Sequence, residues 1–119
     1  MDVDLPHRRR DERPWGGFEQ FTENESSTVK IISVRPDEMF SLQTHAHRDE
    51  FWRILSGNGT VTVGANRASA EAGDEFWIPR GEQHRAQGGR DGPLQFLEIA
   101  FGDFDESDIV RLEDKYGRA

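Results

Sequence analysis

Short runs of apolar, β-branched and aromatic residues recur along the chain, and polar turns separate them. Each run is only three to eight residues long, which suits half-buried strands better than helices. Beyond residue 12 these runs predict strands at 18–21, 29–34, 40–47, 51–55, 59–63, 76–78 and 94–101. Many short strands at close spacing are typical of an all-β sandwich or barrel.

The turn signals between the runs support the same fold class. Pro36-Asp37-Glu38, Gly57-Asn58-Gly59 and the loop from Gly88 to Pro93 combine the residues that best terminate or reverse a strand. Hydrophobic residues make up only 34% of the chain, with a mean hydropathy of −0.82, but eight Phe and three Trp can each bury a large area. The 119 residues therefore predict one domain with a modest core.

Both ends depart from the strand pattern. Residues 1–12 are polar and charged, which predicts a flexible N-terminal tail before a domain at 13–119, with a basic arm that contacts a partner as the alternative. Near the other end, acidic residues from 105 precede Ile109 and Leu112, and Lys115 and Arg118 follow. This charge order suits the helix macrodipole and predicts a short helix over 106–115.

Composition and charge restrict the function classes. The chain has no Cys, so disulfides and thiol catalysis are excluded. No apolar run is long enough for a membrane span or a signal peptide, so we expect a cytoplasmic protein with no membrane partner. A net charge of −8 argues against nucleic-acid binding, and a phosphorylated ligand would need arginines gathered at its pocket.

One stretch concentrates metal-ligand chemistry. On a strand, Gln43, His45 and His47 would point to the same face, and a short turn would bring Glu50 beside them. The Pro-Gly turn before His84 would place a third imidazole on a neighbouring strand. Imidazoles with one carboxylate suit a single divalent transition metal such as Zn, Mn, Fe or Ni.

The two halves of this pattern resemble the motifs of the cupin superfamily, G(x)5HxH(x)3–4E(x)6G and G(x)5PxG(x)2H(x)3N. Glu50 and Gly57 fit the end of the first motif, and Gly73, Pro79, Gly81 and His84 fit the second at every spacing. Three positions depart from it. Asp37 stands where the opening glycine is expected, the gap from His47 to Glu50 is one residue short, and Gly88 replaces the closing asparagine.

Across residues 13–118 the chain is similar to the cupin domain of type II phosphomannose isomerases. The similarity rests on Arg13-Pro14-Trp15-Gly16, on the segments 41–52 and 78–85, and on a terminal Asp-Ile-Val-Arg pattern at 108–111 that continues to Tyr116-Gly117-Arg118. It implies a jelly-roll barrel, also called a double-stranded β-helix, which interconverts mannose 6-phosphate and fructose 6-phosphate. Barrels of this kind often form homodimers by exchanging N-terminal strands, and Trp15 and Phe18 are the interface candidates.

The resemblance also implies roles for individual residues. His45, His47, Glu50 and His84 would hold the metal, and Gln43 would either join them or bind a sugar hydroxyl. Glu98 is the candidate general base, with an exposed strand carboxylate as the alternative interpretation. Arg85, then Lys30 and Arg53, are the candidates for binding phosphate or sugar oxygens, against solvated surface cations.

Other functions remain open from the sequence. Gly88-Gly89 replaces the family's usual Asn-Pro, and Ala100-Phe101 falls where a more polar pair is common. An iron-dependent dioxygenase would use the same ligand types. A sugar- or metabolite-binding module without catalysis is the third hypothesis.

Overall fold

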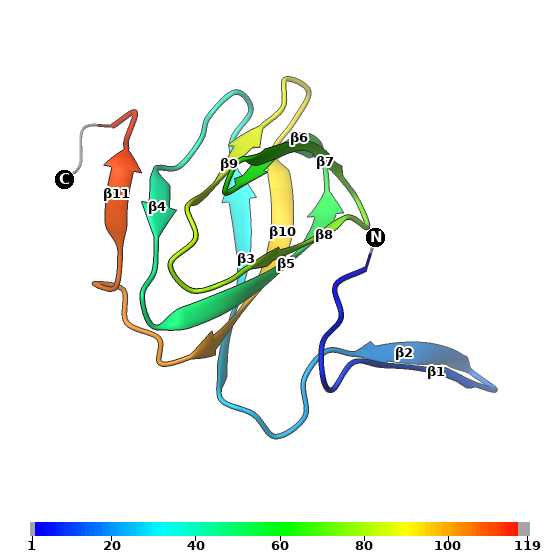
Figure 1. Cartoon of the computed structure of the whole chain (residues 1–119). Helices are drawn as coiled ribbons and strands as arrows, with labels where there is room; N and C mark the ends of the chain where they lie inside the picture. Colours follow the sequence, from blue (N-terminus) through cyan, green and yellow to red (C-terminus); the bar gives the residue numbers. More distant parts are fainter. Residues whose placement is uncertain (1, 117–119) are drawn as a thin grey trace.

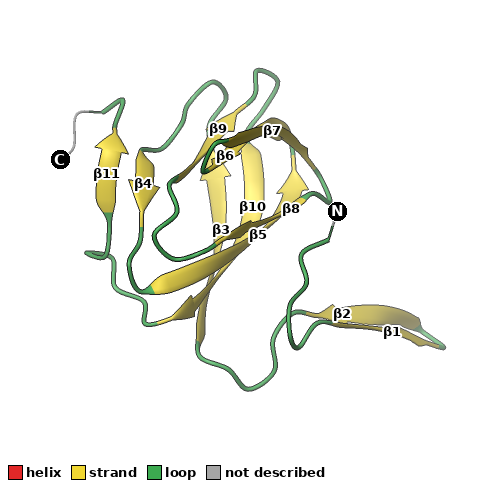
Figure 2. Ribbon diagram, in the orientation of Figure 1, coloured by secondary structure: helices red, strands yellow, loops and turns green. Residues whose placement is uncertain are grey.

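The computed structural model describes residues 2–116, and every regular element in that part of the chain is a β-strand (Figures 1 and 2). The strands are β1 Arg9–Arg13, β2 Gly16–Gln20, β3 Ser27–Val34, β4 Leu42–Thr44, β5 Arg48–Ser56, β6 Asn58–Val63, β7 Asn66–Glu71, β8 Glu75–Ile78, β9 His84–Gly88, β10 Leu94–Gly102 and β11 Val110–Glu113. The prediction of an all-β fold is therefore confirmed.

Two antiparallel sheets form the body of the molecule. One has the strand order β3-β10-β5-β8 and the other β11-β4-β9-β6-β7, while β1 and β2 form a separate hairpin that projects from the body (Figure 1). Their inner faces share one core, made of Val34, Trp52, Ile54, Val61, Ala70, Ile78, Ala86, Leu94 and Phe96. The non-consecutive strand order means that both sheets are assembled from distant parts of the sequence.

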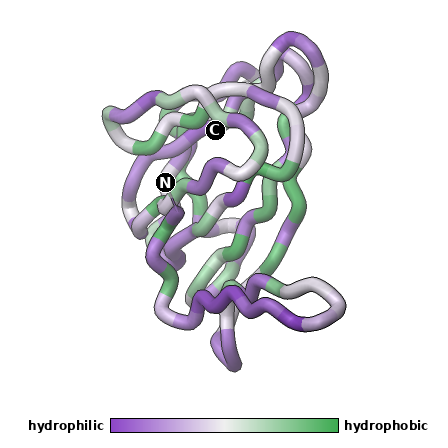
Figure 3. The backbone as a smooth tube through the Cα atoms, turned by 90° about the vertical axis from the view of Figure 1, so that its right-hand side faces the viewer, coloured by the Kyte–Doolittle hydropathy of each residue, from purple (hydrophilic) through white to green (hydrophobic). Residues whose placement is uncertain are grey.

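Strand β5 shows how the sequence pattern produces this packing. Trp52 and Ile54 point into the shared core, as the period of two along a strand requires. Phe51, which directly precedes Trp52, points to the opposite face and is also buried, beside Ile99 and Leu5. In the tube of Figure 3, hydrophobic and hydrophilic stretches alternate along the chain, with no long hydrophobic run.

The expected flexible tail at 1–12 is not what the structure shows in residues 2–12. Leu5 packs against the outer face of the four-stranded sheet with 5% of its surface exposed, and residues 9–13 form β1. Arg8 donates two hydrogen bonds to the buried Glu75 carboxylate, at 2.6 and 2.7 Å. The charged residues that predicted a solvated tail therefore include Arg8, whose ion pair with Glu75 holds this segment against the sheet.

The predicted C-terminal helix over 106–115 is wrong. That region contains strand β11, which pairs with the edge strand β4 through Val110 opposite Thr44 and Arg111 opposite Gln43. The backbone of β4 offers hydrogen bonds to β11, and the acidic residues 105 and 108 bind loop N–H groups instead of opening a helix. Gly117 and Arg118, the end of the terminal pattern, lie outside the described residues.

The predicted strand at 40–47 is also shorter than expected, because β4 ends at Thr44. Upstream of β4 the chain turns at Asp37, whose φ of 61° lies in the left-handed region. A Cβ on Gly88 would collide with the Arg35 carbonyl, so the glycine there permits a close backbone approach.

None of the described residues belongs to a helix that is long and apolar enough to cross a membrane.

Candidate metal centre

Three buried side chains from distant parts of the chain meet inside the molecule. His45 directly follows β4, Glu50 lies on β5 and His84 begins β9, so both large sheets contribute. Their ligand atoms all lie within 4.8 Å of one another. His45 Nε2 is 3.4 Å from Glu50 Oε2, and His84 Nε2 is 3.7 Å from Glu50 Oε1.

Backbone carbonyls fix the orientation of both imidazoles. His45 Nδ1 lies 2.6 Å from the Asp108 carbonyl oxygen, and His84 Nδ1 lies 3.0 Å from that of Glu82. Because a carbonyl oxygen can only accept, each Nδ1 carries the proton and each Nε2 presents a lone pair towards Glu50. Metal-binding histidines usually donate their other ring N–H to a carbonyl or carboxylate oxygen in this way.

The surroundings of His84 fit a metal ligand. Its Nε2 is buried and, among the described residues, has no hydrogen-bond partner. Burial also lowers the pKa of His84, which keeps the ring neutral and able to donate its lone pair. A buried lone pair that faces a carboxylate and a second imidazole is suited to a divalent cation.

The Glu50 carboxylate is held by two donors on its own strand. Trp52 Nε1 donates to one oxygen at 3.0 Å and Arg48 Nε to the other at 2.9 Å. Arg48 Nη2 also lies 3.1 Å from His45 Nε2, so a bound metal would replace this hydrogen bond. Sequence reasoning missed Arg48 and Trp52, although the period of two along a strand places both on the face of Glu50.

Gln43 lies at the edge of this group. Its Nε2 is 3.3 Å from His45 Nε2, while its Oε1 accepts a hydrogen bond from Ser41 Oγ at 2.8 Å. The amide would have to turn its oxygen inward to act as a ligand. Because Gln43 lies next to His45, two predictions remain for it: that it binds the metal, or that it binds a sugar hydroxyl.

The structure does not bring His47 into the group. Since β4 ends at Thr44, the chain no longer alternates as a strand, and His47 is exposed beside Asp103 and Asp105. The motif fits better two residues earlier, with Gln43 and His45 in its HxH positions. Asp37 then precedes Gln43 by the five intervening residues of the pattern, and four residues separate His45 from Glu50.

Asp108 is the second feature that sequence reasoning missed. Its carboxylate accepts hydrogen bonds from the N–H groups of Ala46 and His47, both at 2.9 Å. Because its carbonyl also holds His45 Nδ1, the terminal Asp-Ile-Val-Arg segment fixes the loop that carries the first histidine. The sequence offered two signals, the terminal Asp-Ile-Val-Arg pattern of the family and the acidic cluster that predicts a helix start, but neither assigned Asp108 a role at the site.

A cavity of about 200 Å³ reaches the candidate ligand His45 and the Arg48 and Trp52 side chains that hold Glu50. Its lining includes Lys30, Gln43, His45, Glu98, Glu106 and Arg111. Glu98 is buried on β10, opposite Lys30 on β3 and Trp52 on β5. Burial, followed by repulsion from Glu50, raises the pKa of Glu98 to about 7.

The predicted cations are distributed unevenly. Lys30 lines the cavity, but Arg85 points to the other side of β9, where it donates to the carbonyl oxygens of Phe40 and Glu113. Arg53 pairs with Glu19 and Glu75 in the network that holds the N-terminal segment. The structure therefore brings Lys30 to the candidate site and places Arg85 and Arg53 away from it.

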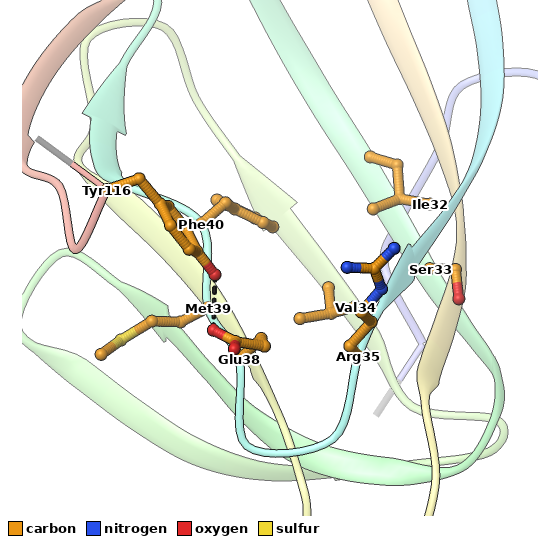
Figure 4. A pocket seen from close by; sticks show the side chains of 8 residues that line it. All are labelled: Ile32, Ser33, Val34, Arg35, Glu38, Met39, Phe40 and Tyr116. Carbon is orange, nitrogen blue, oxygen red and sulfur yellow. Dashed lines mark hydrogen bonds between the residues drawn. The ribbon is translucent and has the colours of Figure 1, made fainter. Parts of the chain in front are cut away.

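A second cavity, of about 500 Å³, adjoins the first and shares Ile32 and Phe40 with it. Figure 4 shows its two sides, with Arg35 on the strand side and Tyr116 opposite. Tyr116 donates a hydrogen bond of 2.6 Å to Glu38 across its rim. The candidate metal centre thus lies at one end of a longer, partly apolar depression.

The fold and the site define a cupin, a double-stranded β-helix protein, and comparisons with known proteins agree. A Klebsiella pneumoniae protein described by its double-stranded β-helix domain superposes with a TM-score of 0.65 at 17% identity, covering 96% of this chain and 91% of that one. A Bacillus subtilis oxalate decarboxylase, which has Mn(II) centres, gives a TM-score of 0.65 at 28% identity, covering 74% and 24%.

The family is more specific than the fold. Residues 3–114 match the family described as mannose-6-phosphate isomerase C-terminal, and the chain belongs to that family. It is 36% identical over 107 residues to the mannose-1-phosphate guanylyltransferase ManC of Salmonella typhimurium, and 38% identical over 107 residues to the xanthan biosynthesis protein XanB of Xanthomonas campestris. Each alignment covers 89% of this chain but only 22% and 23% of those relatives.

Proposed function

We propose that this chain is a metal-dependent sugar-phosphate isomerase that interconverts mannose 6-phosphate and fructose 6-phosphate. The observation that carries the proposal is a buried carboxylate, Glu98, that lines the same cavity as the candidate metal ligand His45. Membership of the mannose-6-phosphate isomerase C-terminal family supports the same reaction.

The reaction needs one proton to move between two adjacent carbons. In the open-chain aldose, Glu98 would remove the proton from C2 and return it to C1 of the enediol, while a second proton moves between the two oxygens. When bound to His45, Glu50 and His84, a divalent metal would supply Lewis-acid stabilisation of negative charge on those oxygens. Trp52 and Phe40 line the cavity and pack against each other edge to face.

The first test is the conversion of mannose 6-phosphate to fructose 6-phosphate by the metal-loaded protein. The Glu98→Gln variant keeps the shape of the side chain but removes the base, and we expect kcat to fall by about 10²–10⁴-fold. Glu71→Gln, which neutralises an exposed carboxylate on β7, is the matched control and should leave the rate unchanged.

Three results would reject the isomerase. One is conversion no faster than that of a His45→Ala/His84→Ala double variant. A second is oxygen consumption with candidate substrates, which would favour a dioxygenase. The third is tight sugar-phosphate binding without any turnover, which would favour a binding module.

A further inference from the structure

The mouth of the candidate metal cavity is lined by opposed charges. Lys30 projects from β3, and its Nζ lies 2.8 Å from Glu106 Oε1 in the segment between β10 and β11. Arg111 on β11 lines the same cavity. Lys30 and Arg111 therefore both line this cavity, in a protein with a net charge of −8.

The Glu106 carboxylate can be replaced by another anion at Lys30. The Glu106 side chain is 77% exposed and that of Lys30 is 37% exposed, so water can solvate the carboxylate as soon as it leaves. Exposed pairs of this kind contribute little to stability. The third cation of the lining, Arg48, is buried and bound to Glu50, so it is not exchangeable in the same way.

Lys30 has a second contact that does not depend on Glu106. Its Nζ lies 4.3 Å from the centre of the Phe104 ring, and the Arg48 guanidinium lies 4.5 Å from the same ring. Cation–π contacts of this kind hold a charged side chain in position without neutralising its charge. Lys30 would therefore still point to the cavity mouth after Glu106 had moved away.

We propose that Lys30 and Arg111 form an anion subsite in this cavity, that the Glu106 carboxylate occupies its Lys30 end, and that a phosphomonoester displaces the carboxylate. A phosphomonoester carries between one and two negative charges at neutral pH and three acceptor oxygens, whereas Glu106 offers one charge. It can bind an ammonium and a guanidinium together, which favours exchange. Glu106 would then act as an internal competitor that a phosphorylated ligand must displace, and it would not affect ligands without a phosphate.

This inference rests on the proposed function for the identity of its ligand, but its test is a binding measurement. The dissociation constants of mannose 6-phosphate and mannose are measured by calorimetry on the full chain, with its metal content determined. Glu106→Gln removes the competing charge, and we expect mannose 6-phosphate to bind about two- to fivefold more tightly. Lys30→Met should weaken that binding by at least tenfold, and neither variant should change the binding of mannose.

Glu38→Gln is the matched control. Glu38 is also an exposed carboxylate in an ion pair, with Lys115 at 2.6 Å, but it borders the neighbouring cavity. It changes the net charge by the same amount as Glu106→Gln and should leave the affinity within a factor of about 1.5. Circular dichroism of each variant separates a lost subsite from a lost fold.

The outcomes separate this inference from the isomerase proposal. If Glu106→Gln and Glu38→Gln have equal effects on mannose 6-phosphate, or if folded Lys30→Met binds it normally, the subsite is rejected even when isomerisation is observed. If the expected changes in affinity occur without isomerisation, the subsite stands and the reaction proposal fails.

Discussion

At the scale of single residues, the candidate metal centre is defined by which imidazole nitrogen atoms face the Glu50 carboxylate. Carbonyl oxygens take the Nδ1 protons of His45 and His84, so both Nε2 atoms face the Glu50 carboxylate. His47, only two residues from His45, is exposed because the strand ends before it. A two-residue difference in sequence therefore decides whether a histidine can reach the site.

We expect His84→Ala to abolish stoichiometric metal binding, because it removes one of three buried ligands. Its effect should exceed the 10–100-fold loss of metal affinity that is typical when a group that hydrogen-bonds to a metal ligand is removed. His47→Ala is the control and should retain the metal. Metal analysis after incubation with Zn, Mn, Fe and Ni tests both variants, and metal loss from His47→Ala alone would support the original HxH interpretation.

At the scale of elements, two segments that lie outside the cupin motifs hold the molecule together. Strand β11 extends the five-stranded sheet at β4 and brings Asp108 to the loop that contains His45. The N-terminal segment covers the outer face of β5 and β10 and is held by Arg8, Glu19, Arg53 and Glu75. Both segments act through contacts made far away in sequence.

Asp108→Ala should lower metal affinity by about 10–100-fold, because it releases the N–H groups of Ala46 and His47 and loosens the loop that orients His45. Asp108→Asn should recover part of the loss, since its amide oxygen can still accept a hydrogen bond. Titration with a competing metal indicator gives the affinities. Ser107→Ala is the control in the same segment, and an equal loss there would show general disruption instead of a specific role for Asp108.

Glu75 should make the stability of the N-terminal segment depend on pH. Burial alone would raise its pKa, but hydrogen bonds from Arg8 and the Val3 N–H outweigh burial and leave the pKa below its ordinary value. A lowered pKa in the folded state stabilises the fold above the unfolded pKa of about 4.3. That stabilisation is lost as the pH falls through the folded value.

Denaturant unfolding at several pH values tests this linkage. Glu75→Gln should cost about 1–3 kcal/mol at pH 7 and should lose less stability than the wild type below about pH 4. Glu71→Gln changes an exposed carboxylate and should follow the wild-type profile. Parallel pH profiles for Glu75→Gln and the wild type would contradict the assignment.

At the scale of the whole molecule, large apolar side chains are exposed on the projecting hairpin and on an edge strand. Trp15 is 74% exposed on the projecting hairpin, and Ile31 is 66% exposed on β3, an edge strand of its sheet (Figure 1). Exposed edge strands and large apolar side chains are typical of interaction surfaces. These features support the expected homodimer, with Trp15 and Phe18 at its interface.

Light scattering after size exclusion tests the dimer. We expect a mass of twice 13.6 kDa for the wild type and a shift towards monomer for Trp15→Ser/Phe18→Ser. Leu112→Ser, which alters an exposed apolar residue on β11, should not change the mass. A monomeric wild type at high protein concentration would reject the interface.

The sequence by itself determined the fold class and most of the site. The alternation of side chains along β5 and β10 is a local property, and it allowed Glu50 and Glu98 to be predicted inside a small β-fold. The Pro-Gly turn before His84 is also local, and it allowed the same prediction for that histidine. Local propensity also misled, because the charges around residues 1–12 and 106–115 are those of a tail and a helix. Those charges are satisfied by partners that are distant in sequence, such as Glu75 and Ala46.

Only the tertiary structure decided which histidine belongs to the site and which cation reaches it. The end of β4 excludes His47, and the alternation of β9 turns Arg85 away while His84 points inward. Lys30, Glu106 and Arg111 line one cavity because β3, β11 and the loop before β11 converge in space. Such convergence depends on strand order and register, which are set by packing between distant segments and leave no local pattern in the sequence.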